Sequence, residues 1–247
     1  MDSKKMTRKQ FDKVCAEKKE QHLSILFRHA QNGVNFVDCS NTYVEDTVTI
    51  GNGTTVYPGV ILSGKTAIGS HCIIGHNTRI IDSTLGDNVE VQSSEIIESS
   101  VGNNTKIGPF AYLRPNNHIG DNVKIGDFVE IKNSTIGNGT KVPHLTYVGD
   151  ADLGTGINLG CGVVFVNYDG TVKHRSTVEN DAFIGCNTNL ISPITVGEKA
   201  YVAAGTTLTK SVPSGALAVG RARQENLLGW VEKSGLLDKN KEKKNLK

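Results

Sequence analysis

The stretch VEDTVTIGNGTTVYPGVILSGKTAIGSHCIIGHNTRI, residues 44–80, carries an aliphatic side chain at every sixth position. Two later blocks of the chain repeat this spacing. The three series are Val44, Ile50, Val56, Leu62, Ile68, Ile74 and Ile80; Val101, Ile107, Leu113, Ile119, Ile125 and Ile131; and Val178, Ile184, Leu190, Val196, Val202 and Leu208. An α-helix repeats about every 3.6 residues and an alternating strand about every 2, so neither produces this pattern. A sustained period of six indicates a solenoid of hexapeptide repeats, each of which is a short strand followed by a turn.

The expected core is long and thin. Three hexapeptides make one triangular coil, their aliphatic side chains point to the axis, and stacked coils bury a continuous core. The hydrophobic content of 37% agrees with an elongated core better than with a spherical one. We therefore predict an all-β fold, a parallel β-helix with a short N-terminal α-helix and a C-terminal extension. The expected boundaries are 1–33 for the helical segment, 34–228 for the β-helix and 229–247 for the extension.

Irregularities in the period predict where the coils depart from the plain repeat. Register breaks near Ser83-Thr84, Thr135 and Asp152 indicate five-residue units or tight corners. The longest break is VVFVNYDGTVKHRST, residues 163–177, where we expect a loop that leaves the β-helix. Loops held on a rigid scaffold are common places for functional residues.

The two ends of the chain differ from the repeats. Residues 7–31 have the spacing of an amphipathic helix, and Asn32-Gly33 supplies a stop signal for it. A helix that lies on a membrane surface is the alternative interpretation. The segment GWVEKSGLL predicts a short helix, and the polar KNKEKKNLK after it is expected to be disordered, with a polybasic membrane anchor as its alternative.

Charge and cysteine usage limit the classes of partner. Lys and Arg number 27 against 25 Asp and Glu, so we expect no binding to nucleic acid or to an acidic membrane surface. The five cysteines include no CxxC pair, and the charged N-terminus has no apolar core of a signal peptide. These features predict a cytoplasmic protein.

Seven motifs together carry a family resemblance. In chain order they are PFAYLRP, GDFVEIKNSTIGNGTKVPHLTYVGDADLG, NLGCG, NYDG, FIGCNTNL, VAAGTTLT and ALAVGRARQ. From about Val34 to Trp230 the chain resembles the C-terminal acetyltransferase domain of bacterial bifunctional glucosamine-1-phosphate acetyltransferase/N-acetylglucosamine-1-phosphate uridylyltransferase. The resemblance implies a left-handed β-helix, acetyl-CoA as co-substrate, an amino-sugar phosphate as acceptor, and a homotrimer. It also places the reaction in the making of UDP-N-acetylglucosamine, a cell-wall precursor. Because only one helix precedes the repeats, no uridylyl transfer and no metal requirement are expected.

Acetyl transfer to an amine needs a base, and a phosphate-bearing acceptor needs cations. His144 is the predicted base, because imidazole titrates near neutral pH and the family's base matches this position. The resemblance adds Asn167 as a second catalytic residue. Its other implied acceptor-binding residues are Arg114, Lys132, Tyr147 and Lys173 for the phosphate, and Glu130, Asn158 and Tyr168 for the sugar. Arginine and lysine supply the fork and the point charge that phosphate binding uses.

The resemblance also assigns an acyl-donor site. Its positions here are Cys161, Cys186, Ala204 and Arg221, with Arg221 expected to pair with the 3′-phosphate of the coenzyme. The family has alanine and serine where this chain has Cys161 and Cys186. A backbone N–H at Cys161 can still stabilise the oxyanion, whereas a thiol at Cys186 bonds the donor less well than a hydroxyl. Asn116 follows Arg114-Pro115 where the family has glycine. Because this turn adjoins the phosphate positions, the resemblance predicts the reaction type more firmly than the identity of the acceptor.

Three other functions remain as alternatives. The first is an acetyltransferase for another amino sugar or nucleotide sugar. The second is a non-catalytic solenoid that assembles with other proteins, although such a protein would not be expected to retain the polar site residues. The third is a zinc hydratase of the γ-carbonic anhydrase type, suggested by His71 and His76 but lacking a third histidine at a suitable distance.

Overall fold

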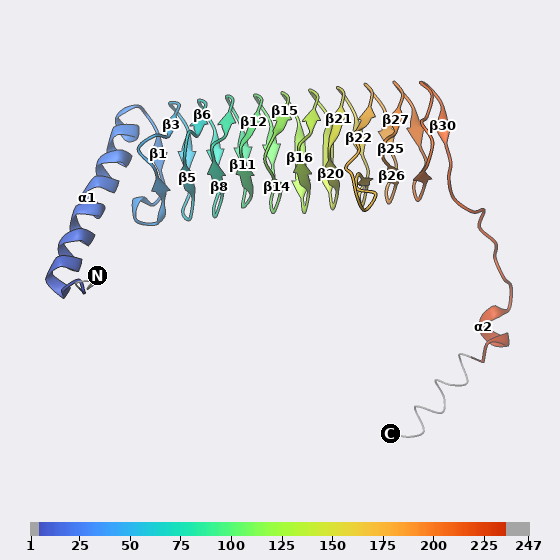
Figure 1. Cartoon of the computed structure of the whole chain (residues 1–247), viewed down its shortest axis with the longest axis horizontal. Helices are drawn as coiled ribbons and strands as arrows, with labels where there is room; N and C mark the ends of the chain where they lie inside the picture. Colours follow the sequence, from blue (N-terminus) through green and yellow to red (C-terminus); the bar gives the residue numbers. More distant parts are fainter. Residues whose placement is uncertain (1–4, 236–247) are drawn as a thin grey trace, which may run out of the picture.

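A triangular prism of stacked coils forms the body of the protein (Figure 1). The computed structural model describes residues 5–235, and the predicted disordered tail lies outside these residues. Helix α1 (Arg8–Gln31) precedes the prism, a 3-10 turn, η1 (Cys39–Asn41), lies in the first coil, and α2 (Trp230–Lys233) follows the last. The three walls are parallel sheets of 11, 10 and 9 strands within the described residues. This confirms the predicted left-handed parallel β-helix.

We name the walls A, B and C. Wall A contains β1 (Asn35–Phe36), β4 (Thr55–Val56), β7 (Ile73–Ile74), β10 (Glu90–Val91), β13 (Lys106–Ile107), β16 (Lys124–Asp127), β19 (Lys141–His144), β22 (Asn158–Leu159), β25 (Phe183–Ile184), β28 (Tyr201–Val202) and β30 (Leu217–Ala218). Wall B contains β2 (Tyr43–Val44), β5 (Ile61–Ser63), β8 (Arg79–Ile81), β11 (Glu95–Ile97), β14 (Tyr112–Leu113), β17 (Glu130–Lys132), β20 (Tyr147–Gly149), β23 (Val164–Val166), β26 (Asn189–Ile191) and β29 (Thr207–Leu208). Wall C contains β3 (Thr49–Ile50), β6 (Ala67–Ile68), β9 (Thr84–Leu85), β12 (Ser99–Val101), β15 (Asn117–Ile119), β18 (Thr135–Ile136), β21 (Ala151–Leu153), β24 (Ser176–Val178) and β27 (Thr195–Val196).

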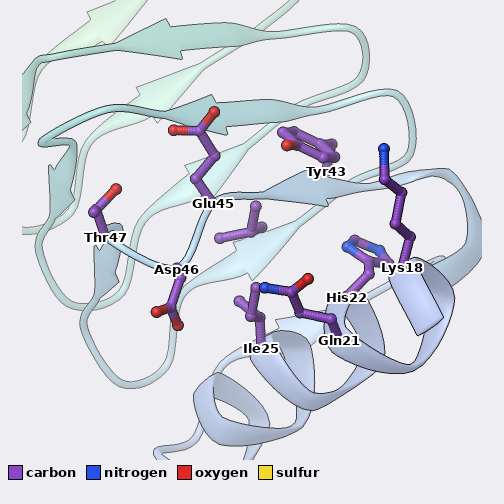
Figure 2. A pocket seen from close by; sticks show the side chains of 9 residues that line it. Lys18, Gln21, His22, Ile25, Tyr43, Glu45, Asp46 and Thr47 are labelled. Carbon is purple, nitrogen blue, oxygen red and sulfur yellow. The ribbon is translucent and has the colours of Figure 1, made fainter. Parts of the chain in front are cut away.

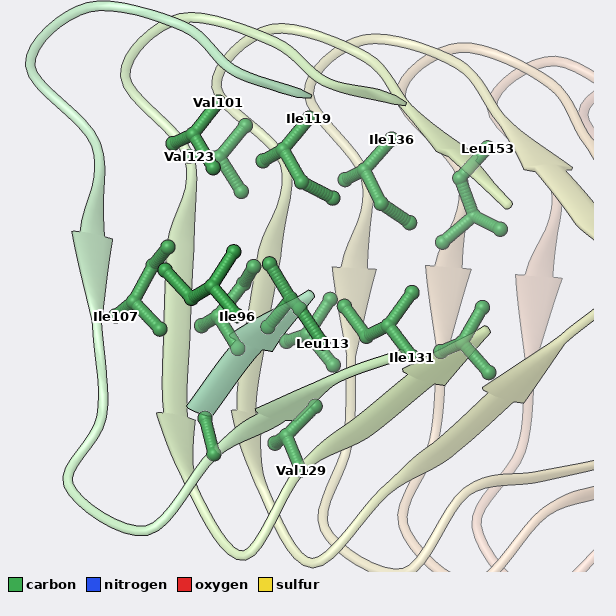
Figure 3. Packing of buried hydrophobic residues seen from close by; sticks show 14 of the residues in the cluster. Ile96, Val101, Ile107, Leu113, Ile119, Val123, Val129, Ile131, Ile136 and Leu153 are labelled. Carbon is green, nitrogen blue, oxygen red and sulfur yellow. The ribbon is translucent and has the colours of Figure 1, made fainter. Parts of the chain in front are cut away.

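The aliphatic residues of the repeat stack in register along the axis. Ile107 pairs with Ile125 on wall A, Leu113 with Ile131 on wall B, and all four are buried. Figure 3 shows such residues pointing inward from successive coils. Because each coil covers the next, the hydrophobic core is one continuous column, and outward side chains stand in files along each wall.

The three short units that the sequence predicted lie at the corner between walls B and C. Ile131 and Ile136 are consecutive core residues only five positions apart, and a residue in the left-handed backbone region, Asn133, turns this corner. Two more were not predicted: Val91 to Ile96, at the corner between walls A and B, and Ile96 to Val101. The 163–177 loop is shorter than predicted, because β23 continues the coil and Phe165 is fully buried six residues after Leu159. The true loop is 167–175, so the prediction began four residues too early.

Helix α1 has the predicted extent but buries little of its apolar stripe. Thr7 and Gln10 form a capping box at its start, and Gly33, at a φ of 86°, follows its end. Of the apolar positions that defined the stripe, Leu26 is buried, whereas Phe11 and Phe27 are exposed. The reason is that only the C-terminal part of α1 touches the first coil, and the rest leans away from the prism (Figure 1).

A groove of about 470 Å³ separates α1 from the first coil (Figure 2). The His22 ring stacks on Tyr43 at a centroid distance of 6.2 Å, and Arg28 pairs with Asp46 at 2.8 Å. The groove lies at the opposite end of the prism from the predicted acyl-donor residues. It is therefore not the place where the predicted chemistry would occur.

Two predicted alternatives can be compared with the fold. No helix among residues 5–235 has the length and apolar character needed to span a membrane. His71 and His76 flank β7 at two different corners, and His76 packs against Tyr57 at 4.9 Å. Within the same residues, no three His, Cys, Asp or Glu side chains are grouped as metal ligands would be.

Candidate active site

Most of the predicted acceptor residues gather on wall B. Arg114 and Lys132 lie next to each other in one file, and Gly149 is the next position of that file. A neighbouring file holds Glu130 and Tyr147. Parallel coils are about 4.8 Å apart, so side chains of consecutive coils in one file can touch.

Arg114 is paired with a carboxylate of the next coil, on the strand that also carries Lys132. Its Nη1 donates to Oε1 of Glu130 at 2.9 Å, and this bond raises the pKa of the guanidinium. Both side chains are partly exposed. Arg114 is therefore a fixed cation whose remaining N–H groups face solvent over wall B.

Two lysines meet above Arg114. The contact with Lys173 lowers the pKa of Lys132, with burial and the charge of Lys173 acting in the same direction. Two ammonium groups side by side repel each other, and an anion placed between them relieves that repulsion. With Arg114 nearby, this pair forms the kind of cation cluster that binds phosphate.

Gly149 makes room for the polar groups above the lysines. A Cβ atom at this position would lie 2.3 Å from Oη of Tyr147 and 2.8 Å from Nδ2 of Asn167. Those two atoms are themselves 3.5 Å apart. The missing side chain of Gly149 therefore lets Tyr147 and Asn167 converge over the wall.

A buried carboxylate that the sequence did not single out holds Asn167. The Nδ2 atom of Asn167 donates to Oδ2 of Asp150 at 2.5 Å, and Nδ2 of Asn133 donates to Oδ1 at 2.5 Å. Asp150 appeared only as a letter of the motif HLTYVGDA. Its relation to Asn133 could have been found by counting one coil, 17 residues, back along the chain.

Loop 167–175 is held in one shape by its own hydrogen bonds. Oδ1 of Asp169 accepts from the backbone N–H of Thr171 and of Val172, each at 2.8 Å, and Oδ2 bonds Nε2 of His174 at 2.6 Å. These donors, led by the N–H of Val172, lower the pKa of Asp169. A bridge between Tyr168 and Lys173 closes the loop. The bridge sets Lys173 opposite Tyr168, and Lys173 approaches Lys132 closely enough to lower its pKa. The hydroxyl of Tyr168 donates to the carbonyl of Gly170, and its ring is exposed.

His144 lies at the corner between walls A and B with a carboxylate partner. Its Nδ1 is 2.7 Å from Oδ1 of Asp127, which stands one coil below in register. The bond to His144 lowers the pKa of Asp127. The side chains are 54% and 39% exposed, so the Nε2 side of the imidazole is open. Asp127 is the second residue that the sequence reasoning missed, and the 17-residue coil spacing would have indicated it.

The predicted acyl-donor residues form a file that begins at His144. Successive coil pairings place Cys161, Cys186 and Ala204 in line above the imidazole. Three coil steps of about 4.8 Å make this file about 14 Å long. At its far end, Nη1 of Arg221 donates to the carbonyl of Ala204 at 2.6 Å. The file has the extended shape that a pantetheine arm needs.

Asn158 does not join the acceptor cluster. It lies on β22 of wall A, whereas Arg114, Lys132 and Tyr147 belong to wall B. Cys161 and Cys186 are both unpaired thiols. One chain therefore brings the predicted phosphate ligands together with both Glu130 and Asn167. It places His144 at the adjacent corner but leaves Asn158 on another face.

The coil geometry agrees with two matches to known repeat families. The family described as bacterial transferase hexapeptide (six repeats) matches residues 98–133, and the hexapeptide repeat of succinyl-transferase matches residues 176–210. Two segments of the chain thus match hexapeptide-repeat families, and its fold is of the left-handed parallel β-helix class.

Within that class, the chain matches bacterial proteins named bifunctional protein GlmU, which confirms the resemblance read from its motifs. It is 62% identical over 212 residues to the protein of Alkaliphilus oremlandii, covering 86% of this chain and 47% of that protein. It is 55% identical over 212 residues to the protein of Alkaliphilus metalliredigens, covering 86% of this chain and 46% of that protein. It is 54% identical over 224 residues to the protein of Clostridium acetobutylicum, covering 91% of this chain and 49% of that protein. The chain thus spans about half the length of the curated relatives it matches.

Solved structures support the fold alone. A UDP-N-acetylglucosamine acyltransferase from Campylobacter jejuni superposes with a TM-score of 0.52 at 21% identity, covering 78% of this chain and 76% of that one. The corresponding enzyme from Bacteroides fragilis gives 0.50 at 20% identity, covering 73% and 70%.

Proposed function

We propose that this protein is an N-acetyltransferase that moves the acetyl group of acetyl-CoA to the amine of an amino-sugar phosphate, namely glucosamine-1-phosphate. The amine nitrogen forms a bond to the thioester carbonyl carbon as a base takes the amine proton. The carbon–sulfur bond breaks, and the protonated base gives its proton to the departing sulfur, so that coenzyme A leaves as the thiol. The observation that carries the proposal is the cation cluster of wall B. Arg114 and Lys132 are neighbours in one file of wall B, and Lys173 is close enough to Lys132 to lower the pKa of that lysine, so a dianionic phosphate would be attracted by all three cations. The similarity to the GlmU proteins supports the same reaction.

His144 is the base in this proposal. Asp127 accepts from the Nδ1 side of the ring, so the Nε2 lone pair remains available to take the amine proton. Transfer is direct from donor to acceptor, and no cysteine is used as a nucleophile. The file from Cys161 to Arg221 would hold the extended donor with its thioester next to the imidazole.

The working unit in this proposal is a homotrimer with sites shared between copies. Asn158 on wall A can meet a substrate bound to wall B only if wall A belongs to a second chain. An apolar ridge of Phe110, Phe128 and Leu145 supports this contact. These residues are 59%, 57% and 56% exposed and take positive φ angles of 59°, 55° and 45°. Bulky residues adopt that region at a cost, which a neighbouring chain packed against the ridge would offset. All five cysteines are unpaired, which agrees with a cytoplasmic location.

Acetyl-CoA turnover by the purified chain tests the proposal. The acceptors are glucosamine-1-phosphate, glucosamine-6-phosphate, glucosamine and UDP-glucosamine, and the product is identified by mass. The expected result is fastest turnover with glucosamine-1-phosphate. Faster turnover with UDP-glucosamine would favour the alternative of a nucleotide-sugar acetyltransferase, and no turnover with any acceptor would favour the non-catalytic alternative.

A further inference from the structure

Asp150 is a buried carboxylate at the corner between walls B and C. It is 7% exposed and takes a φ of 50°, directly after the last residue of β20. Its backbone joins two parts of the candidate site. The N–H of Asp150 donates to the carbonyl of Lys132 at 3.0 Å, and its carbonyl accepts from the N–H of Ser176, just beyond loop 167–175. Asp150 therefore links the lysine pair to the loop that carries Asn167 and Lys173.

The carboxylate of Asp150 fixes which way the amide of Asn167 points. An ionised carboxylate only accepts hydrogen bonds, so Asn167 must present its NH₂ group to Oδ2 of Asp150. The same Nδ2 atom lies 3.5 Å from Oη of Tyr147. The side-chain oxygen of Asn167, Oδ1, is then left to accept a hydrogen bond from outside the cluster, and no described residue of the chain donates to it, whereas the backbone carbonyl of Asn167 already accepts from the N–H of His174 at 2.8 Å.

The charge of Asp150 opposes anion binding. Its negative charge acts on Lys132 and raises the pKa of that lysine, against the stronger effect of Lys173. A carboxylate near a phosphate site weakens the attraction of the site for a dianion. Anion binding therefore does not explain why a carboxylate stands at position 150, whereas the orientation of Asn167 does.

We propose that Asp150 is a positioning residue. It turns the side-chain oxygen of Asn167, Oδ1, toward the acceptor amine, so that one amine N–H donates to Oδ1 and the nitrogen lone pair is directed at the thioester. The proposal rests on the proposed function and adds to it a contact between Asn167 and the acceptor amine. No step passes through Asp150 itself, because it reaches the substrate only through Asn167.

The test is the variant Asp150→Asn, which keeps the shape of the side chain. Its own NH₂ group must face the amide of Asn133 or Asn167, and one of these has to turn. We expect kcat to fall about 10- to 100-fold, the scale of a displacement of about 1 Å at a reacting group. The KM for glucosamine-1-phosphate should stay the same or fall, because a negative charge near the lysines is gone. Asn133→Ala is the matched control. It removes the other amide bound to Asp150, leaves Asn167 in place, and should keep kcat within about twofold.

Two results would overturn the proposal: an Asp150→Asn kcat within about twofold of wild type, or a fall in kcat together with a raised KM and a lowered melting temperature, as a purely structural role would give. The double variant Asp150→Asn/Asn167→Ala separates this inference from the proposed function. If Asp150 acts through Asn167, the double variant is no slower than Asn167→Ala alone, and a further loss contradicts the inference. Wild-type activity of Asn167→Ala would instead remove the proposed role of Asn167.

Discussion

Replacing Gly149 by alanine disturbs the candidate site by a distance that the structure supplies. The new Cβ would lie 2.3 Å from Oη and 2.6 Å from Cζ of Tyr147, whereas ordinary contacts begin at 3.4 Å. The end of the tyrosine must therefore move by about 1 Å, and Nδ2 of Asn167, at 2.8 Å, must move less. A shift of about 1 Å in a binding or catalytic group costs up to about 10²-fold. We expect kcat/KM for glucosamine-1-phosphate to fall about 10- to 100-fold.

The fold should tolerate this substitution. The atoms that would be struck first belong to the free end of a side chain over an open wall, so the melting temperature should fall by only a few degrees. Steady-state kinetics and thermal melting of the same preparation measure both effects. The double variant with Tyr147→Ala is the control, because it removes both atoms that the new Cβ would strike first, so Gly149→Ala should add little to the loss that Tyr147→Ala causes alone. A Gly149→Ala enzyme with wild-type kcat/KM would refute the assignment of Tyr147 and Asn167 to the acceptor site.

Three further predictions concern the base and the sharing of sites. His144→Gln should lower kcat by about 10²- to 10⁴-fold, the usual worth of a general base, with unchanged circular dichroism; near-normal turnover would exclude His144 as the base. Asp127→Ala should lower kcat about tenfold or more. In Asp127→Asn the amide oxygen can still accept from Nδ1 of His144, so kcat should stay within a few fold of wild type. Equal losses in the two variants would show that the charge of Asp127 matters more than the hydrogen bond. Asn158→Ala and Lys132→Ala chains, each weakly active alone with glucosamine-1-phosphate, should regain about a quarter of wild-type activity when they are unfolded together and refolded as a mixture, since random pairing of walls A and B makes about one intact site in four. No recovery would mean that both residues serve a site within one chain.

The period of six was enough to predict the fold because it is a property of the core alone. The spacing of Ile107, Leu113 and Ile119 assigns one core residue to each of the three walls of a coil, and this assignment requires no information about side-chain contacts. The short units that end at Leu85, Ile136 and Leu153 were predicted for the same reason, whereas the two between Val91 and Val101 were missed because the six-residue series is interrupted there. The predicted loop began too early because VVFV has no glycine or polar residue and so does not look like the other repeats. The spacing of six from Leu159 to Phe165 nevertheless continues the coil through this segment.

The candidate site was only partly predictable. Motifs indicated Arg114, Lys132 and Tyr147, and the structure places them in adjoining files. Asp127 and Asp150 were missed because their partners are one coil away, at 17 residues, a relation that short motifs do not express. The separation of Asn158 from the cluster was also hidden, since wall membership depends on counting strands around the corner. The exposed stripe of α1 shows the same limit, because a helical period predicts an apolar face but not what covers it.

The central claim is that the cation cluster of wall B binds the phosphate of the acceptor. A double-mutant cycle tests it most directly by comparing wild type and Lys132→Ala, each with glucosamine-1-phosphate and with glucosamine. We expect Lys132→Ala to lower kcat/KM about 10- to 100-fold for the phosphorylated sugar, since a hydrogen bond to a charged group is lost, and to leave the value for glucosamine almost unchanged. An equal loss for both sugars would contradict the claim, because it would show that Lys132 does not sense the phosphate.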